Sequence, residues 1–287
     1  MQGWRKRMED SHISDLNISK NSHVFGVFDG HGGKEVAQFV RKHFTDELKK
    51  NKNYANGVYK KALIETFLRM DELCLEPSGQ IELKEENRLS KEDDEKQEKN
   101  NPNRQNDIYS QLITRINNDD NIAMFTGCTA TVCLIQENKM YFANAGDSRI
   151  VLSKKGIAYP MTIDHKPDLD SEKNRIYKAE GWVAEGRVKG NLNLSRSFGD
   201  MEYKQNKKLK PEEQMITAYP DLVEENLTDD CDFIILGCDG IWDCKTNQEA
   251  VDFVADRLKK DSNAKLSSII ESLLDQIVAP DIYTGNF

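Results

Sequence analysis

The stretch SHVFGVFDGHGG at residues 22–33 constrains the fold more than any other part of this chain. It begins as a buried apolar strand, stops at an Asp-Gly turn, and is followed by a helical pattern over residues 34–50. The glycines around His31 allow a close approach of the backbone. The Asp29 carboxylate and the Gly30 carbonyl are therefore candidate hard oxygen ligands for a cation. An isolated Asp-Gly pair is more often an ordinary turn, so other features of the chain must decide.

The chain has 287 residues, 38% of them hydrophobic, and no convincing linker, which predicts a single domain over residues 1–287. Its formal net charge of −9 argues against a nucleic-acid-binding surface. No run of 18 apolar residues exists and the N-terminus is too polar for a secretory signal, so we expect no membrane span. Six cysteines without metal-ligand spacing predict reduced thiols and a cytoplasmic or nuclear protein, which we expect to be a monomer.

The pattern of apolar and polar residues in the rest of the chain predicts a layered α+β domain. Apolar and β-branched residues predict strands within residues 126–136, 139–153 and 232–238, and amphipathic patterns predict helices within residues 58–75, 170–181, 247–259 and 262–278. Residues 80–106 differ, because they are dense in Glu, Asp, Lys, Asn and Gln. Such a stretch buries little apolar surface, so we expect a disordered or loosely helical insert there. A solvated loop is the simpler interpretation, and a regulatory docking segment is the alternative.

Several acidic residues follow predicted strands. Two strands end in the same way, at Asp29-Gly30 and at Asp239-Gly240, and Asp147 closes a third. Further acidic candidates are Glu9, Asp10 and Asp243. Strand ends on one side of a sheet converge, and a cluster of oxygen ligands suits Mg²⁺ or Mn²⁺ better than zinc. Two such ions commonly activate water against a phosphate. Each Asp taken alone is better explained as a turn residue, and the spacing of the set does not by itself decide for a metal site.

Seven segments, in order, resemble the signature of the metal-dependent serine/threonine protein phosphatases of the 2C type. They are MQGWRKRMED at residues 1–10, VFDGHGG at 27–33, TGCTATV at 126–132, ANAGDSR at 143–149, DHKP at 164–167, LSRSFGD at 194–200 and CDGIWD at 238–243. The resemblance covers nearly the whole chain apart from residues 80–106. It implies a four-layer α-β-β-α sandwich, in which two antiparallel sheets pack face to face and helices cover their outer faces.

The resemblance also implies an activity and a set of site residues. The activity is hydrolysis of phosphoserine and phosphothreonine in phosphorylated proteins, by water activated at two Mg²⁺ or Mn²⁺ ions. The implied metal-site residues are Asp29 as the bridging ligand, the Gly30 carbonyl, Asp239 at the second ion, Glu9 through a water with Asp10 beside it, and Asp147 and Asp243 with Asp239 at a looser third ion.

Two further residues are implied to be catalytic. Arg5 would clamp the substrate phosphate, and His31 would protonate the departing Ser or Thr oxygen. Taken without the resemblance, Arg5 is an ordinary surface cation and His31 a bystander in a loop. Arg196 and Asp200 are expected to make structural pairings, with no assigned role.

The chain departs from the family pattern at both ends. Family members carry a strand before the segment at residues 1–10, and after the last helix they carry one more metal-binding Asp and a final strand. We therefore expect a fragment with impaired activity. The alternative function is a catalytically impaired relative that binds phosphoproteins as a scaffold or regulator. The presence of Arg5, Asp29, His31 and Asp239 favours the enzyme, while substrates and regulation are not indicated.

Overall fold

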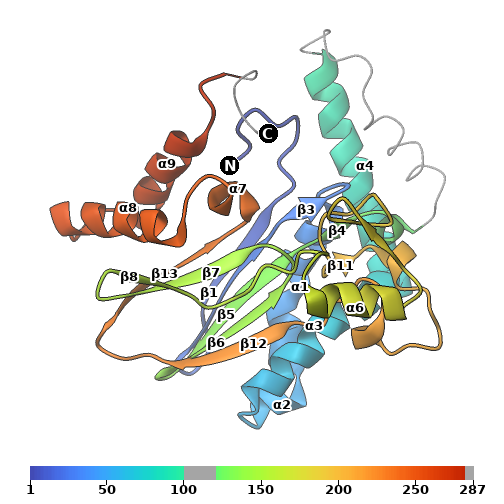
Figure 1. The fold of residues 1–287 in the computed structure, drawn as a ribbon, viewed down its shortest axis with the longest axis horizontal. Coiled ribbons are helices and arrows are strands. Elements are labelled where there is room, and N and C mark those ends of the chain that lie inside the picture. The colour runs from blue at the N-terminus through green and yellow to red at the C-terminus, as the bar shows by residue number, and fades with distance from the viewer. Residues whose placement is uncertain (100–120, 282–287) are drawn as a thin grey trace.

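Two antiparallel sheets form the centre of the molecule (Figure 1). The computed structural model describes residues 1–99 and 121–281, with the backbone alone for residues 93–99. The five-stranded sheet has the order β1-β2-β5-β6-β12, with β1 Ser11–Ser19, β2 Ser22–Phe28, β5 Ala130–Gln136, β6 Lys139–Ala145 and β12 Asp221–Asn226. The second sheet has the order β13-β7-β8, with β7 Arg149–Lys154, β8 Ile157–Pro160 and β13 Cys231–Gly237.

Helices cover the outer face of each sheet. The five-stranded sheet is covered by α1 (Glu35–Lys50), α3 (Tyr59–Leu75) and α4 (Pro77–Lys99), with the short α2 (Lys52–Ala55) beside them. The second sheet is covered by α8 (Asn247–Lys260) and α9 (Leu266–Ile277). In Figure 1 these two groups of helices lie on opposite sides of the strands. The expected four-layer α-β-β-α sandwich is confirmed.

Separate apolar clusters hold the four layers together. Between the sheets, Cys133 and Phe142 of the larger sheet pack with Ile150 and Leu152 of the smaller one, and all four are almost completely buried. The outer clusters join each sheet to its own helices. Because both faces of each sheet are covered, the strands contain nearly continuous apolar residues, which explains why β5, β6 and β13 were predictable from sequence.

Smaller elements complete the fold near one end of the sandwich. The short strands β3 (Gly30–His31), β4 (Gly127–Cys128) and β11 (Phe198–Gly199) pair in the order β11-β4-β3. Helix α6 (Asp170–Lys178), the hairpin β9 (Val183–Ala184) and β10 (Arg187–Val188), and the single-turn helices Ile122–Met124, Met201–Tyr203 and Pro211–Glu213 fill the connections. Helix α7 (Asp239–Trp242) is one turn long and directly follows β13.

Most predicted elements are present with small shifts in their ends, including the capping box in which Thr246 and Glu249 start α8. Strand β1 was not predicted. It lies at the edge of its sheet, and of its apolar residues only Ile13 is buried, whereas Leu16 points to solvent. An edge strand that buries so little has a weak sequence pattern.

The prediction for residues 80–106 needs correction over its first part, while residues 100–106 lie outside the described residues. Helix α4 runs to Lys99 and packs against α1 and α3. Leu83, on the inner face of this helix, is fully buried, and the Asn87 amide donates to the buried Glu35 carboxylate at 3.2 Å. A few apolar residues are enough to pack this helix against the body, because their helical spacing places them on one face. Composition alone does not reveal that spacing.

We expect Leu83→Ala to lower the free energy of unfolding by about 2–5 kcal/mol, because it leaves a cavity between α4 and the body. Ile81 lies on the same helix but is 70% exposed, so Ile81→Ala is the matched control and should change stability by less than about 0.5 kcal/mol. Urea denaturation measures both. Equal effects of the two variants would contradict the packing of α4.

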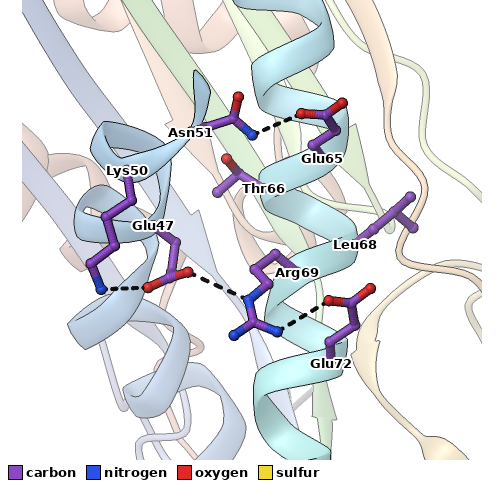
Figure 2. A pocket seen from close by; sticks show the side chains of 8 residues that line it. All are labelled: Glu47, Lys50, Asn51, Glu65, Thr66, Leu68, Arg69 and Glu72. Atoms are coloured by element: carbon purple, nitrogen blue, oxygen red, sulfur yellow. Dashed lines mark hydrogen bonds and ion pairs between the residues drawn. The ribbon is translucent and has the colours of Figure 1, made fainter. Parts of the chain in front are cut away.

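Figure 2 shows an open groove between α1 and α3 whose charged side chains neutralise one another. Arg69 contacts Glu47 at 3.5 Å and Glu72 at 3.1 Å, Lys50 contacts Glu47 at 2.7 Å, and Asn51 donates to a carboxylate on α3. A ligand entering this groove would have to break these pairs. We therefore interpret this groove as part of the contact between the two helices and not as a binding site.

All six cysteines are free thiols, as predicted, and Cys74, Cys128 and Cys133 are buried. Within the described part of the chain, no helix has the length and apolar character needed to cross a membrane.

Candidate metal centre and catalytic site

Strand ends from both sheets meet at one edge of the sandwich. Ser11 at the start of β1 pairs with Phe28 at the end of β2, so residues 10 and 29 face each other there. Ala130 at the start of β5 pairs with Ala145 at the end of β6, and Gly237 at the end of β13 pairs with Arg149. Since β6 and β7 are joined by three residues only, this register brings residues 9–10, 29, 146–148 and 238–239 to the same edge.

Most of the predicted acids form one cluster at this edge. Oxygens of Asp10 and Asp29 and the sulfur of Cys238 lie within 4.8 Å of one another. Burial, with repulsion from Asp10, Asp239 and Asp147, raises the pKa of Asp29 to about 8. Burial and the charge of Asp147 likewise raise the pKa of Asp239 to about 6. Asp29 and Asp239 are 210 residues apart in sequence and nevertheless share one electrostatic environment.

Glu9 and Gly30 lie against each other beside this cluster. A side chain at Gly30 would collide with the backbone carbonyl oxygen of Glu9, so glycine is required there for close approach of the two segments. Burial raises the pKa of Glu9 to about 7, and its Oε1 atom is buried without a hydrogen-bond partner. An orphaned buried carboxylate oxygen is unusual and calls for a ligand.

The two remaining acids differ in their surroundings. Asp147 is buried, and its Oδ2 atom accepts a hydrogen bond from the Lys166 ammonium at 2.5 Å. Asp243 is exposed just after α7, and its backbone N–H donates to the Asp239 carbonyl at 2.8 Å. Asp243 raises the pKa of Asp239, which places it within the field of the cluster.

Arg5 lies on an exposed turn next to the acids. Its charge acts to lower the pKa of both Glu9 and Asp239. The Gln2 side-chain amide donates to the Arg5 carbonyl at 2.9 Å, and the Trp4 indole donates to the carbonyl of Ala279 beyond α9 at 2.8 Å. The N-terminal segment is therefore anchored to the opposite end of the chain while it carries a cation toward the cluster.

His31 pairs with a residue that sequence reasoning left without a role. Its Nε2 atom lies 2.7 Å from Oδ2 of Asp200, whose side chain is 5% exposed. Burial acts to lower the pKa of His31, but the Asp200 carboxylate outweighs it and the pKa is raised. Ser197 donates to the same carboxylate at 2.5 Å. A side chain at Gly127 would collide with Asp200 and lie 2.7 Å from His31 Nε2, so this glycine makes room for the pair.

Arg196 makes the structural pairing that was expected of it. It contacts the buried Glu172 carboxylate at 2.7 Å and Asp221 at 2.7 Å. Burial acts to raise the pKa of Glu172, but hydrogen bonds and charges from Arg196 and Arg175 lower it to about 2. This ion network joins α6 to the segment that carries Asp200.

The chemistry of these donors fits divalent cations of the Mg²⁺ and Mn²⁺ type. Hard carboxylate and carbonyl oxygens dominate the cluster, and burial raises the pKa of the Cys238 thiol, which disfavours the thiolate that zinc would select. Burial and mutual repulsion raise the pKa of Asp29 and Asp239, and a nearby cation would relieve the repulsion. The orphaned Glu9 oxygen points to the same kind of ligand.

A four-layer sandwich with a carboxylate cluster at one sheet edge is the arrangement that the resemblance to the metal-dependent protein phosphatases led us to expect. Comparison with known proteins agrees. The family described as "Protein phosphatase 2C" matches residues 1–88 and 76–282. "Protein phosphatase 2C 1" of Paramecium tetraurelia is 46% identical over 287 residues, covering 99% of this chain and 86% of that protein. "Probable protein phosphatase 2C 21" of Arabidopsis thaliana is 43% identical over 297 residues, covering 99% of this chain and 81% of that protein.

The chain therefore belongs to the protein phosphatase 2C family and is a serine/threonine protein phosphatase. Solved structures support the fold independently. A phosphatase from Toxoplasma gondii matches with a TM-score of 0.71 at 21% identity, covering 96% of this chain and 85% of that one. "Serine-threonine phosphatase 2C" from the same organism matches with a TM-score of 0.69 at 17% identity, covering 96% and 86%.

Proposed function

We propose that this phosphatase hydrolyses phosphoserine and phosphothreonine in proteins at the acidic edge, with two Mg²⁺ or Mn²⁺ ions and a looser third one. The observation that carries the proposal is the acidic cluster itself. Oxygens of Asp10 and Asp29 lie within 4.8 Å of each other, and burial together with repulsion between the acids raises the pKa of Asp29 and Asp239. When bound, the ions supply an activated water at neutral pH and offset the charge of the phosphate.

The acids take separate tasks in this proposal. The Asp29 carboxylate, the Gly30 carbonyl and the Asp239 carboxylate would hold the two tighter ions. Glu9 and Asp10 orient water from the N-terminal side, which suits the orphaned Glu9 oxygen. Asp147 and Asp243 join Asp239 at the looser position.

The protein's own cations act on the substrate. The planar guanidinium of Arg5 binds two phosphate oxygens at once and aligns the phosphorus. His31 donates a proton to the departing Ser or Thr oxygen, which would otherwise leave as an unstable alkoxide. The Asp200 carboxylate, 2.7 Å from the ring, fixes the orientation of His31 and favours its protonated form.

Turnover of a phosphoserine peptide during a Mn²⁺ titration tests the proposal. We expect no turnover with excess chelator, and Asp239→Asn should need roughly tenfold more Mn²⁺, because it loses one charged ligand. Asp252→Asn, on the exposed face of α8, is the matched control and should behave as the unmodified chain does. Turnover that persists in chelator would overturn the proposal, and peptide binding without turnover would favour a scaffold.

A further inference from the structure

Lys166 places a positive charge inside the acidic cluster. Its Nζ atom lies 2.5 Å from Oδ2 of Asp147, whose side chain is only 3% exposed. Asp239 and Asp243 also act on Lys166, since both raise its pKa. Asp147, which contacts this ammonium, and Asp239 and Asp243, whose charges act on it, are the same three acids that the proposed function assigns to the looser ion.

The position of Lys166 is built by its neighbours rather than reached by a free surface side chain. The adjacent His165 donates its backbone N–H to the Gly146 carbonyl at 2.9 Å, and its Nδ1 accepts from the Gly146 N–H at 3.1 Å. Asp164 is held by Arg149 through two hydrogen bonds of 2.9 and 2.7 Å. These contacts join residues 164–166 to the strand ends on both sides of Asp147.

The Lys166 side chain is nevertheless 41% exposed. Its flexible stem can carry the ammonium outward into water, whereas the buried Asp147 carboxylate cannot follow. The pair can therefore open without a change in the backbone, leaving a carboxylate that needs another cation.

We propose that Lys166 is a built-in counter-ion that competes with the looser divalent cation for Asp147, Asp239 and Asp243. The inference rests on the proposed function, because it assumes that these acids hold that ion. An ammonium at the site repels an incoming cation and must be displaced from Asp147 before the ion binds. Lys166 thus keeps this position weaker than the two tighter ones.

Counting bound Mn²⁺ on the full chain, by electron paramagnetic resonance and calorimetry, tests the inference without measuring activity. In Lys166→Met the weakest Mn²⁺ should bind about tenfold more tightly, because one repelling charge has been removed. Lys166→Gln removes the charge but keeps a hydrogen-bond donor for Asp147, and it should also bind the weakest Mn²⁺ more tightly. This variant keeps the test valid if Lys166→Met folds poorly. Lys166→Arg keeps the charge and should resemble the unmodified chain.

Lys173→Met is the matched control, since it removes the same charge from the nearby helix α6, where Lys173 faces Asp168 at 3.8 Å. It should leave all Mn²⁺ affinities unchanged. An unchanged or weaker third Mn²⁺ in both neutral Lys166 variants would overturn the inference, because it would mean that Lys166 only holds its loop against Asp147. Two tight ions with no third in any variant would also overturn it, together with the looser third ion, while leaving the hydrolysis proposed at the two tight ions intact. Loss of the two tight ions from the unmodified chain would refute the proposed function itself.

Discussion

Asp29→Asn is expected to lose almost all turnover and, in the metal-free protein, to be more stable than the unmodified chain. At saturating Mn²⁺ we expect kcat for a phosphoserine peptide to fall by roughly 10²–10³-fold or more, because a carboxylate proposed to hold the two tighter ions is lost. The gain in stability arises because the variant no longer buries a carboxylate that is also repelled by Asp10, Asp239 and Asp147.

The stability effect has a defined pH dependence. Asp29 releases its proton near pH 4 when the chain is unfolded but holds it to about pH 8 when folded. The folded state therefore binds more protons between these values, and the stability of the metal-free chain falls as the pH rises through this range. Asp29→Asn removes that contribution, so at pH 7.5 in chelator it should gain on the order of 2 kcal/mol.

Urea denaturation at pH 5.5 and pH 7.5, with chelator and with Mn²⁺, measures this difference. Asp252→Asn on α8 is the control and should follow the unmodified chain at both pH values. Mn²⁺ should stabilise the unmodified chain strongly and Asp29→Asn much less, since only the former keeps the full ligand set. A metal-free Asp29→Asn protein that is less stable than the unmodified chain would contradict the idea that the buried Asp29 carboxylate destabilises the metal-free fold.

Asp200→Asn is expected to slow the hydrolysis of a phosphoserine peptide much more than that of p-nitrophenyl phosphate. We expect kcat for a phosphoserine peptide to fall by about 10–100-fold, because His31 loses the carboxylate that orients and charges it. Hydrolysis of p-nitrophenyl phosphate should change by less than about threefold, because its leaving group departs without a proton. Asn tolerates the left-handed backbone of residue 200, where φ is 52°, so the variant should fold.

Two further variants test whether Asp200 acts through His31. His31→Gln should show the same split between substrates to a larger extent, and it should add little to Asp200→Asn if the two residues act as one unit. Ser197→Ala removes another hydrogen bond to the Asp200 carboxylate but leaves the His31 contact in place, so its effect should be small. An equal loss on both substrates in Asp200→Asn would indicate structural damage instead.

Much of this protein could be predicted from local patterns. The turn after β2, the helix α1 and the capping box of α8 depend on neighbouring residues, and all three are present. The acids that end β2 and β13 were also identified, because a strand that stops at Asp-Gly is a local feature. The packing of helix α4 was the main feature missed, since a disordered or loosely helical insert was expected and the helix instead buries Leu83 against the body.

The family was thus recognisable from the sequence alone, and the candidate site residues could be proposed from it, because each lies in a short segment whose pattern does not depend on distant partners. Only the tertiary structure decided which of these segments touch. Asp200 meets His31 across 169 residues, and Lys166 meets Asp147 through the packing of a loop against Gly146. Such contacts depend on strand register and on the space left by glycines such as Gly30 and Gly127. These contacts form only when the two sheets are packed together.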